Sequence, residues 1–251
     1  MAPTLVTIRF SHFCDKARWA LDHCGVAYHE RAYLPGLHQI GTRPHGGRST
    51  PLLVTPGGVL RQSTEIVGYA DRHAAAERRL YPDDAGARAE VDAFVAEMDA
   101  SLGPATRRLA YHHLLPHPSV LVRAVGGGLS RAERLLFRVL IPAFERPMRR
   151  VMRIDEAGAE RSVQAIRRTL DDVSARLRDG RRYLFGDRLG AADITFAALS
   201  APVVMPLGHP CYASDVSALP EPLRRLAEEA RATAAGRFAT RLYAEERRYQ
   251  G

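Results

Sequence analysis

A short apolar run that leads directly into a helical segment is the feature that most constrains the fold of this chain. Residues 4–9, TLVTIR, have the β-branched and apolar content of a strand. Residues 12–24, HFCDKARWALDHC, carry small and apolar side chains at helical spacing. Gly25 follows, where a helix commonly ends in a left-handed residue. The strand and the helix therefore meet at Ser11-x-x-Cys14.

A junction of this kind favours a sulfur atom in its thiolate form. The backbone N–H groups and the dipole at a helix N-terminus attract negative charge. Ser11-x-x-Cys14 has the spacing of a Cys-x-x-Cys redox motif, but serine replaces the first cysteine, so its most direct dithiol chemistry is absent. We expect the Ser11 hydroxyl to donate a hydrogen bond to the sulfur of a bound thiol. The structural alternative is that Ser11 only caps the helix.

Cys14 is the competing catalytic candidate. A thiol in the first turn of a helix can have a lowered pKa and form mixed disulfides with substrate thiols. If Cys14 instead faces inward, its sulfur is a small buried apolar group. Cys24 and Cys211 are expected to be packing residues. Three widely spaced cysteines form neither a disulfide framework nor a zinc site, which is typical of a reduced cytosol.

The rest of the first part of the chain alternates strands and helices. Residues 26–33 predict a second strand, residues 52–54 and 59–60 a hairpin, and Ser63 opens a further helix. The segment 34–48, rich in Gly, Pro and His, is expected to be an irregular active-site segment.

Beyond residue 75 the pattern becomes helical. Residues 76–87 lack periodicity and are expected to be a linker. Apolar residues then define helical faces, the first interrupted at Gly103-Pro104, and residues 193–204 are apolar nearly all round, which predicts a buried central helix. The remaining predicted helices lie at 163–177, 223–230 and 238–242.

The net charge of +8 suggests a nucleic-acid or anionic-membrane partner, but its distribution does not. Lys16 is the only lysine among 36 basic residues, a skew typical of a GC-rich genome. The arginines are spread beside acidic residues, and no nucleic-acid-binding motif is present. We expect a protein without a nucleic-acid partner. With no signal-peptide pattern and no apolar run of about 20 residues, we also expect a soluble, cytoplasmic protein.

Several segments together resemble the glutathione S-transferase family. The first is the start of the chain, SHFCDKARWAL followed by VAYHE, which resembles the beginning of the family's thioredoxin-like domain. The others are STPLL at 49–53, QSTEI at 62–66 and DRLGAADI at 187–194, which resemble the cis-proline loop, the γ-glutamyl-binding turn and the start of the buried central helix. The resemblance implies an α+β protein with a thioredoxin-like βαβ-ββα domain followed by an all-α domain. We place these at 1–75 and 88–251.

The same resemblance assigns roles to individual residues. Ser11 corresponds to the position where the family carries Ser or Cys. The peptide bond before Pro51 is expected to be cis, with the backbone around Thr50 pairing with the cysteinyl part of glutathione. Ser63, at a helix start, suits the γ-glutamyl carboxylate. Gln62 departs from the family, which carries Glu or Asp there to meet the substrate's ammonium group. The remaining glutathione-binding candidates are Phe13, His38 and His45, with Arg43 as an alternative for the glycyl carboxylate.

The second-substrate pocket is expected to come from the helical part of the chain. Arg107, Tyr111 and His112 are candidates by position only, with an ordinary exposed or interdomain face as the alternative. His112, His113 and His117 do not form a convincing metal site, because adjacent histidines point to different helix faces and no carboxylate or Cys completes the set. We expect no metal and no cofactor other than glutathione as cosubstrate. Asp193 is expected to cap the central helix rather than to take part in catalysis.

Residues 117–153 do not fit a minimal transferase domain. Seven arginines between Arg131 and Arg153 are interleaved with Leu, Val, Phe and Met. One interpretation is a basic amphipathic helix for a membrane surface or a partner. We favour a helix packed on its own domain with a solvated arginine face, because Pro142 and Pro147 should break a long lipid-facing stripe.

The sequence as a whole predicts a glutathione S-transferase-like enzyme, expected to be a homodimer. It would activate the thiol of glutathione, or of a related low-molecular-weight thiol, for attack on a small hydrophobic electrophile or a peroxide. Two alternatives remain open: a Cys14-dependent thiol-disulfide or deglutathionylating enzyme, and a non-catalytic protein of the same fold that binds ligands or partners.

Overall fold

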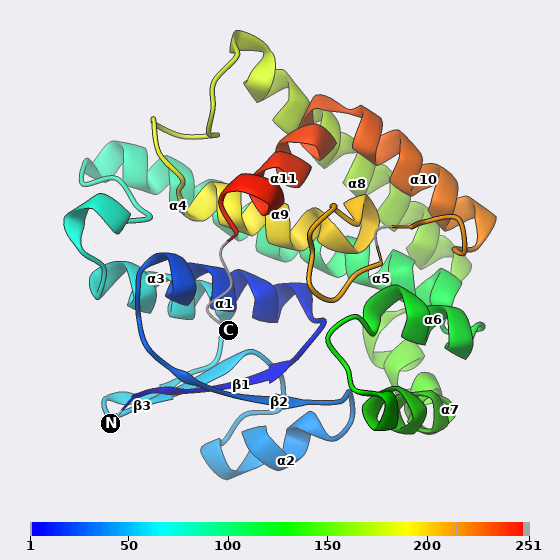
Figure 1. Ribbon diagram of the computed structural model, residues 1–251. Coiled ribbons are helices and arrows are strands. Elements are labelled where there is room, and N and C mark those ends of the chain that lie inside the picture. The colour runs from blue at the N-terminus through cyan, green and yellow to red at the C-terminus, as the bar shows by residue number, and fades with distance from the viewer. Residues whose placement is uncertain (1, 214, 248–251) are drawn as a thin grey trace.

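The computed structural model describes residues 2–213 and 215–247. A mixed four-stranded sheet with its helices comes first, and a larger all-helical part stacks above it (Figure 1). The strands are β1 (Thr4–Ile8), β2 (His29–Tyr33), β3 (Leu52–Thr55) and β4 (Gly58–Leu60). Their spatial order is β2-β1-β3-β4, with β1 and β2 parallel and the other two pairs antiparallel. This arrangement is the predicted βαβ-ββα unit.

Helices cover both faces of the sheet. Helix α1 (His12–His23) and helix α3 (Ser63–Arg72) lie on the face toward the helical part, and the short α2 (His38–Thr42) lies on the other (Figure 1). A 3₁₀ turn, η1 (Arg43–His45), follows α2. The segment 34–48, predicted to be irregular, therefore holds two short elements. Helices of three to five residues are too short to show a hydrophobic period in the sequence.

Helix α1 lies between the sheet part and the helical part of the molecule and contacts both. It packs against α3 on one side and α9 on the other, so ten of its twelve residues are buried. Trp19, at its centre, is fully buried. Gly25 ends the helix with a φ of 69°, as the sequence predicted.

The helical part contains eight α-helices within the described residues. They are α4 (Ala85–Ala100), α5 (Leu102–Leu114), α6 (Pro118–Val125), α7 (Arg131–Met152), α8 (Glu156–Arg176), α9 (Ala191–Val204), α10 (Glu221–Ala232) and α11 (Ala234–Glu245). Two further 3₁₀ turns, η2 (Ala76–Arg78) and η3 (Leu177–Asp179), lie before α4 and after α8. Helix α4 begins at Ala85, inside the segment predicted to be a linker.

Helix α9 forms the centre of the helical part, as its apolar sequence predicted. Thirteen of its fourteen residues are buried, and α1, α4, α5, α10 and α11 surround it. Asp193 accepts hydrogen bonds from the backbone N–H groups of Leu184 and Gly190, both at 2.8 Å. Its expected role at the start of this helix is confirmed.

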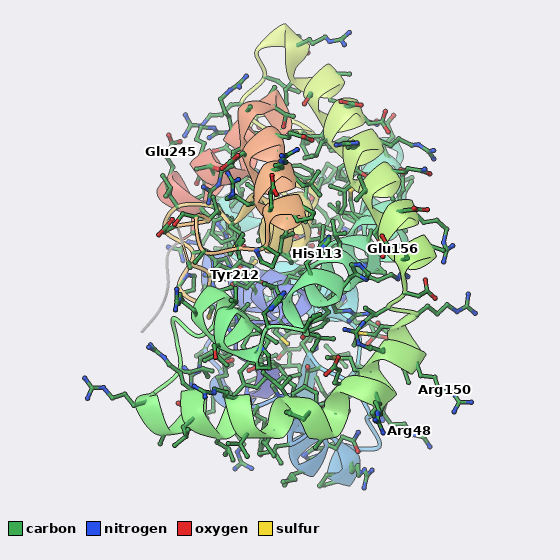
Figure 2. All side chains as sticks on the ribbon, turned by 90° about the vertical axis from the view of Figure 1, so that its right-hand side faces the viewer. Arg48, His113, Arg150, Glu156, Tyr212 and Glu245 are labelled. Carbon is green, nitrogen blue, oxygen red and sulfur yellow. The ribbon has the colours of Figure 1, made fainter. Side chains whose placement is uncertain are left out.

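Helix α7 is the helix that the sequence favoured for this segment. It runs without interruption from Arg131 to Met152 although Pro142 and Pro147 lie inside it. Its length lets it lie across one side of the molecule in Figure 2, where Arg150 extends outward near its end. Of the helices in the described ranges, none is long and apolar enough to cross a membrane.

Candidate functional site

A cavity of about 330 Å³ opens between the sheet part and the helical part. The sheet part supplies the junction after β1, the segment around α2 and the residues before Pro51. The helical part supplies α5, α6, α7 and two residues after α9. The main lining residues are Ile8, Phe10, Ser11, His12, His38, Ser49, Thr50, Arg107, Ala110, Tyr111, Leu114, Leu121, Phe144, Met148, Met205 and Tyr212. Most are apolar, and no acidic side chain is among the described residues that line it.

Ser11 lies at the point where the first strand leads into α1. It has the extended backbone angles of an N-cap residue, with φ −75° and ψ 124°, but its side chain makes no capping hydrogen bond. The interpretation of Ser11 as a simple helix cap is therefore wrong. Its backbone N–H donates to the carbonyl oxygen of Ile8 at 3.0 Å, which closes the turn. The half-buried side chain faces the cavity, where its hydroxyl is available to a ligand.

Cys14 lies behind Ser11 in the protein interior. Its side chain is fully buried, and burial raises the pKa of the thiol. Arg18 and hydrogen bonds with the hydroxyls of Ser11 and Thr50 act in the opposite direction without reversing this effect. Of the two alternatives for Cys14, the structure agrees with the inward-facing, buried thiol and not with a lowered pKa, because desolvation of a buried thiolate outweighs the helix N-terminus.

The bond between Thr50 and Pro51 is cis, as the sequence predicted. Pro51 itself is buried, whereas Ser49 and Thr50 line the cavity. The backbone before Pro51 therefore borders the same space as Ser11. These two segments, far apart in the sequence, form one side of the cavity.

The start of α3 lies outside the lining of this cavity. Ser63 is the first residue of α3 and is buried, while Gln62 before it is exposed. The carboxylate of Glu65 accepts hydrogen bonds from the backbone N–H groups of Arg61 and Gln62, at 2.7 and 3.0 Å. The only acidic group in this first turn is thus already occupied by the backbone.

Three basic residues were proposed from the sequence to bind the glycyl carboxylate of glutathione, and they differ in their position relative to the cavity. His38 lines the cavity, and its Nδ1 accepts a hydrogen bond from the Gly36 N–H at 3.2 Å. Burial lowers its pKa. His45 does not line the cavity, and its carbonyl oxygen accepts a hydrogen bond from Arg61 at 3.0 Å. Arg43 is exposed. His38 is the one of the three that meets the cavity.

Phe13 is not part of the cavity lining. Its ring packs against Gly103 at the start of α5, so closely that a Cβ at residue 103 would lie 2.5 Å from the Phe13 Cζ. The guanidinium of Arg107 lies 5.8 Å from the centre of the same ring. Phe13, proposed from the sequence as a glutathione contact, thus packs its ring on helix α5 instead of lining the cavity.

Helix α5 presents one face to the cavity. Arg107, Ala110, Tyr111 and Leu114 lie on this face at spacings of three and four residues. His112 points elsewhere, because it is five residues from Arg107 and thus about 140° away around the helix. Its Nε2 lies 3.4 Å from the Glu156 carboxylate at the start of α8. His112 does not line the cavity, so its assignment to the second-substrate pocket is wrong. Glu156 and the neighbouring His113 are labelled in Figure 2.

Other lining residues were not identified from the sequence. His12 donates a hydrogen bond from Nε2 to the Gly103 carbonyl oxygen at 2.9 Å, and burial lowers its pKa to about 3. Tyr212 donates from its hydroxyl to the Phe10 carbonyl oxygen at 2.9 Å (labelled in Figure 2). Phe144 and Met148 come from α7. No motif marks them, because tertiary packing alone brings them to the cavity.

Helix α7 therefore has one face toward the site. Phe137 and Ile141 are buried, and Phe144 and Met148 continue this stripe into the cavity. The opposite face is exposed and carries Leu135 and Val139 among the arginines, with 64% and 66% of these side chains accessible. The predicted solvated arginine face is thus also partly apolar.

Two family models match the chain. The glutathione S-transferase N-terminal domain matches residues 5–78, and the glutathione S-transferase C-terminal domain matches residues 156–199. Helices α6 and α7 fall between the two matches. No curated protein matches the chain significantly.

Solved glutathione transferases share the fold. Poplar glutathione transferase F1 is 17% identical, covers 97% of this chain and 99% of its own, and gives a TM-score of 0.57. A glutathione S-transferase from Rhodospirillum rubrum F11 is 21% identical, with coverages of 97% and 92% and a TM-score of 0.56. The theta class enzyme from Xanthomonas axonopodis pv. citri, crystallised with glutathione bound, is 20% identical, with coverages of 95% and 97% and a TM-score of 0.54. At these identities the likeness establishes the fold alone.

The family and the fold predicted from the sequence are thereby confirmed. The two domain models match in the order in which the strands and helices occur, and the solved transferases align over nearly the whole chain. This chain belongs to the glutathione S-transferase family.

Proposed function

We propose that the protein is a glutathione-dependent transferase that ionises the thiol of glutathione beside Ser11 and delivers the sulfur to an electrophile in the interdomain cavity. The observation that carries this proposal is the position of the Ser11 hydroxyl, which makes no helix-capping bond at the start of α1 and faces an apolar cavity. A solved relative of the theta class was crystallised with glutathione bound, which supports the choice of thiol.

The energy needed for ionisation is within reach of this geometry. A free thiol has a pKa of about 8.5, and lowering it by about two units requires roughly 2.7 kcal/mol of differential stabilisation. One charge-assisted hydrogen bond contributes about 1.5–3 kcal/mol, and the helix N-terminus adds about 0.3–1 kcal/mol. The Ser11 hydroxyl can donate the charge-assisted hydrogen bond, and the N-terminus of α1 can add the helix contribution. The Cys14 thiol, in hydrogen-bond contact with the Ser11 hydroxyl, is placed to orient it.

The remaining parts of glutathione would extend along the sheet part. The backbone at Thr50 would pair with the cysteinyl unit, and the N-terminus of α3 at Ser63 would hold the γ-glutamyl carboxylate. Gln62 would accept a hydrogen bond from the ammonium group without a charge. His38 would meet the glycyl end. The electrophile would occupy the part of the cavity formed by α5, α6 and α7.

In the reaction, the thiolate sulfur forms a bond to the electrophilic carbon while the bond to the leaving group breaks. The leaving group departs with the electron pair, and the thiol proton passes to solvent. The protein supplies a thiolate held in place and an apolar space that collects the electrophile. No step requires a metal or a further cofactor.

The test is a comparison of Ser11→Ala with Cys14→Ala. Conjugation of glutathione to 1-chloro-2,4-dinitrobenzene should fall about 10- to 100-fold in kcat/KM for Ser11→Ala, the loss of one charge-assisted hydrogen bond. Cys14→Ala should retain most of the activity. If Cys14→Ala alone abolished turnover, a thiol-disulfide mechanism would replace the proposal, although the buried, high-pKa thiol disfavours it.

A non-catalytic binding protein is the second candidate, and Gln62 is the observation that favours it. This exposed amide stands where the family carries a carboxylate, so glutathione would lose one charge pair. Retention on immobilised glutathione without turnover of any electrophile or hydroperoxide would support this candidate. We also propose a homodimer, which sedimentation of the purified chain would test.

A further inference from the structure

Two hydrogen-bond donors on α5 face the cavity without a hydrogen-bond partner among the residues that the structure describes. Arg107 makes no hydrogen bond or ion pair with any described residue, and its guanidinium lies 5.8 Å from the centre of the Phe13 ring. Tyr111, one helical turn later, has no hydrogen bond from its hydroxyl within the described ranges. A guanidinium and a phenol four residues apart lie side by side on a helix.

Neighbouring residues of the same kinds are fully engaged. Arg108 donates from Nε to the Met152 carbonyl oxygen and from Nη1 to the Ser162 hydroxyl, both at 3.0 Å. Tyr212 in the same cavity donates to the Phe10 carbonyl oxygen. The lack of hydrogen-bond partners therefore distinguishes Arg107 and Tyr111 from these two neighbours.

The surroundings leave the charge of Arg107 uncompensated. It is the one arginine among the lining residues, and no carboxylate lines the cavity within the part of the chain that the structure describes. Ala110 and Leu114 flank it on α5, and Phe144 and Met148 face the same space from α7. Burial lowers the pKa of Arg107, a sign that the cation is poorly solvated. Arg107 is half-buried, and a charge partly removed from water among apolar neighbours is stabilised by an opposite charge.

We infer that Arg107 and Tyr111 form an anion-recognition pair, which selects electrophiles that carry a carboxylate on an otherwise apolar body. This inference rests on the proposed transferase function. The guanidinium would bind the carboxylate through two parallel N–H donors, and the Tyr111 hydroxyl would donate a third hydrogen bond. The apolar body would lie against Leu114, Phe144 and Met148.

Glutathione itself carries carboxylates, but its proposed contacts lie on the sheet part of the chain, where Ser11 and Thr50 line the cavity and Ser63 lies outside its lining. Ser11, Thr50 and Ser63 all belong to the sheet part of the chain. Arg107 and Tyr111 belong to α5 and face the space that the helical part encloses. The two arrangements are separable by experiment, because one changes the KM for glutathione and the other the preference among electrophiles.

The test uses two aryl chlorides that differ in one group, 4-chloro-3-nitrobenzoate and 4-chloro-3-nitrobenzamide. In both, the thiolate forms a bond to the ring carbon that bears chlorine, and chloride leaves with the electron pair. The measured quantity is kcat/KM for the acid divided by kcat/KM for the amide. We expect this ratio to fall about 10-fold or more in Arg107→Met, because a charge-assisted hydrogen bond is lost. In Tyr111→Phe we expect it to fall several-fold. Arg107→Lys should recover part of the ratio.

Arg146→Met is the matched control. Arg146 is exposed on α7 beside the cavity-lining Pro147 and does not line the cavity, so this variant removes the same charge without removing the recognition pair. Its ratio should stay at the wild-type value. Equal losses for acid and amide in Arg107→Met, or a change confined to the KM for glutathione, would overturn the inference.

Binding of the two aryl chlorides is measured in parallel by calorimetry with unmodified, unliganded protein. If the wild type turned over neither compound but bound the acid more tightly than the amide in an Arg107-dependent manner, the transferase proposal would fail and the anion site would stand. If turnover occurred with no preference that depends on Arg107, the transferase would stand and the anion site would fail. The thermal stability of each variant shows whether its fold is intact.

Discussion

The Nε2 of His12 donates a hydrogen bond to the carbonyl oxygen of Gly103 at 2.9 Å. This bond joins the first turn of α1 to the first turn of α5, and both helices line the cavity. Burial and the charge of Arg107 lower the pKa of His12 to about 3. The imidazole is therefore neutral in the folded protein throughout the physiological range.

This neutral histidine makes stability depend on pH. In the unfolded chain His12 takes up a proton below about pH 6.5, whereas the folded protein does not until about pH 3. The free energy of unfolding should therefore decrease as the pH falls from 6.5, by about 2 kcal/mol at pH 4.5 from this group alone. In His12→Gln, urea unfolding should show a smaller decrease over the same range. An identical decrease in both proteins would contradict this.

A buried ion pair also connects the two parts of the chain. Lys16 on α1 is fully buried, and its Nζ lies 2.7 Å from Asp99 Oδ1 on α4 and 2.9 Å from the Thr64 hydroxyl on α3. Asp99→Ala should leave the ammonium without its counter-charge and lower the free energy of unfolding by about 3–5 kcal/mol. Lys16→Met in that background should restore part of the loss. If the double variant were as unstable as Asp99→Ala, the penalty would not come from the unpaired charge.

The close approach of Phe13 and Gly103 gives a steric prediction. A Cβ at residue 103 would lie 2.5 Å from Phe13 Cζ, so Gly103→Ala forces the ring to move. Overpacking of about 1–3 kcal/mol should exceed the roughly 1 kcal/mol that alanine gains over glycine in a helix. A smaller residue in Phe13→Leu should relieve the clash in the double variant. Thermal unfolding of the four proteins measures the coupling, and additive effects would rule out this contact as the cause.

Much of the fold was predictable because its signals are local. Gly25 marks the end of α1. The apolar sequence that follows Asp193 predicts a buried helix without any knowledge of the elements that surround it. Helix α2 was missed because a five-residue helix has no visible period. The sequence favoured a packed helix over α7, but its bounds and its continuity through Pro142 and Pro147 follow from the packing of Phe137 and Ile141, which no local pattern reveals.

The site was predictable only where a residue's role depends on its position along one element. Ser11 follows from the strand-to-helix junction. The choice among Arg107, Tyr111 and His112 required a helical face, and the spacing of four residues already favours the first two. Phe13 and Tyr212 depend on contacts over more than 80 residues of sequence, which no local pattern reveals.

The central claim is that Ser11 holds the thiol of bound glutathione as a thiolate. Its most direct test is a spectroscopic pH titration of glutathione bound to the wild type and to Ser11→Ala, monitored by thiolate absorbance. The account predicts a thiol pKa about one to two units below the free value of roughly 8.5 in the wild type, and a return to near that value in the variant. A bound thiol with the pKa of free glutathione, or the same lowered pKa in both proteins, would contradict it.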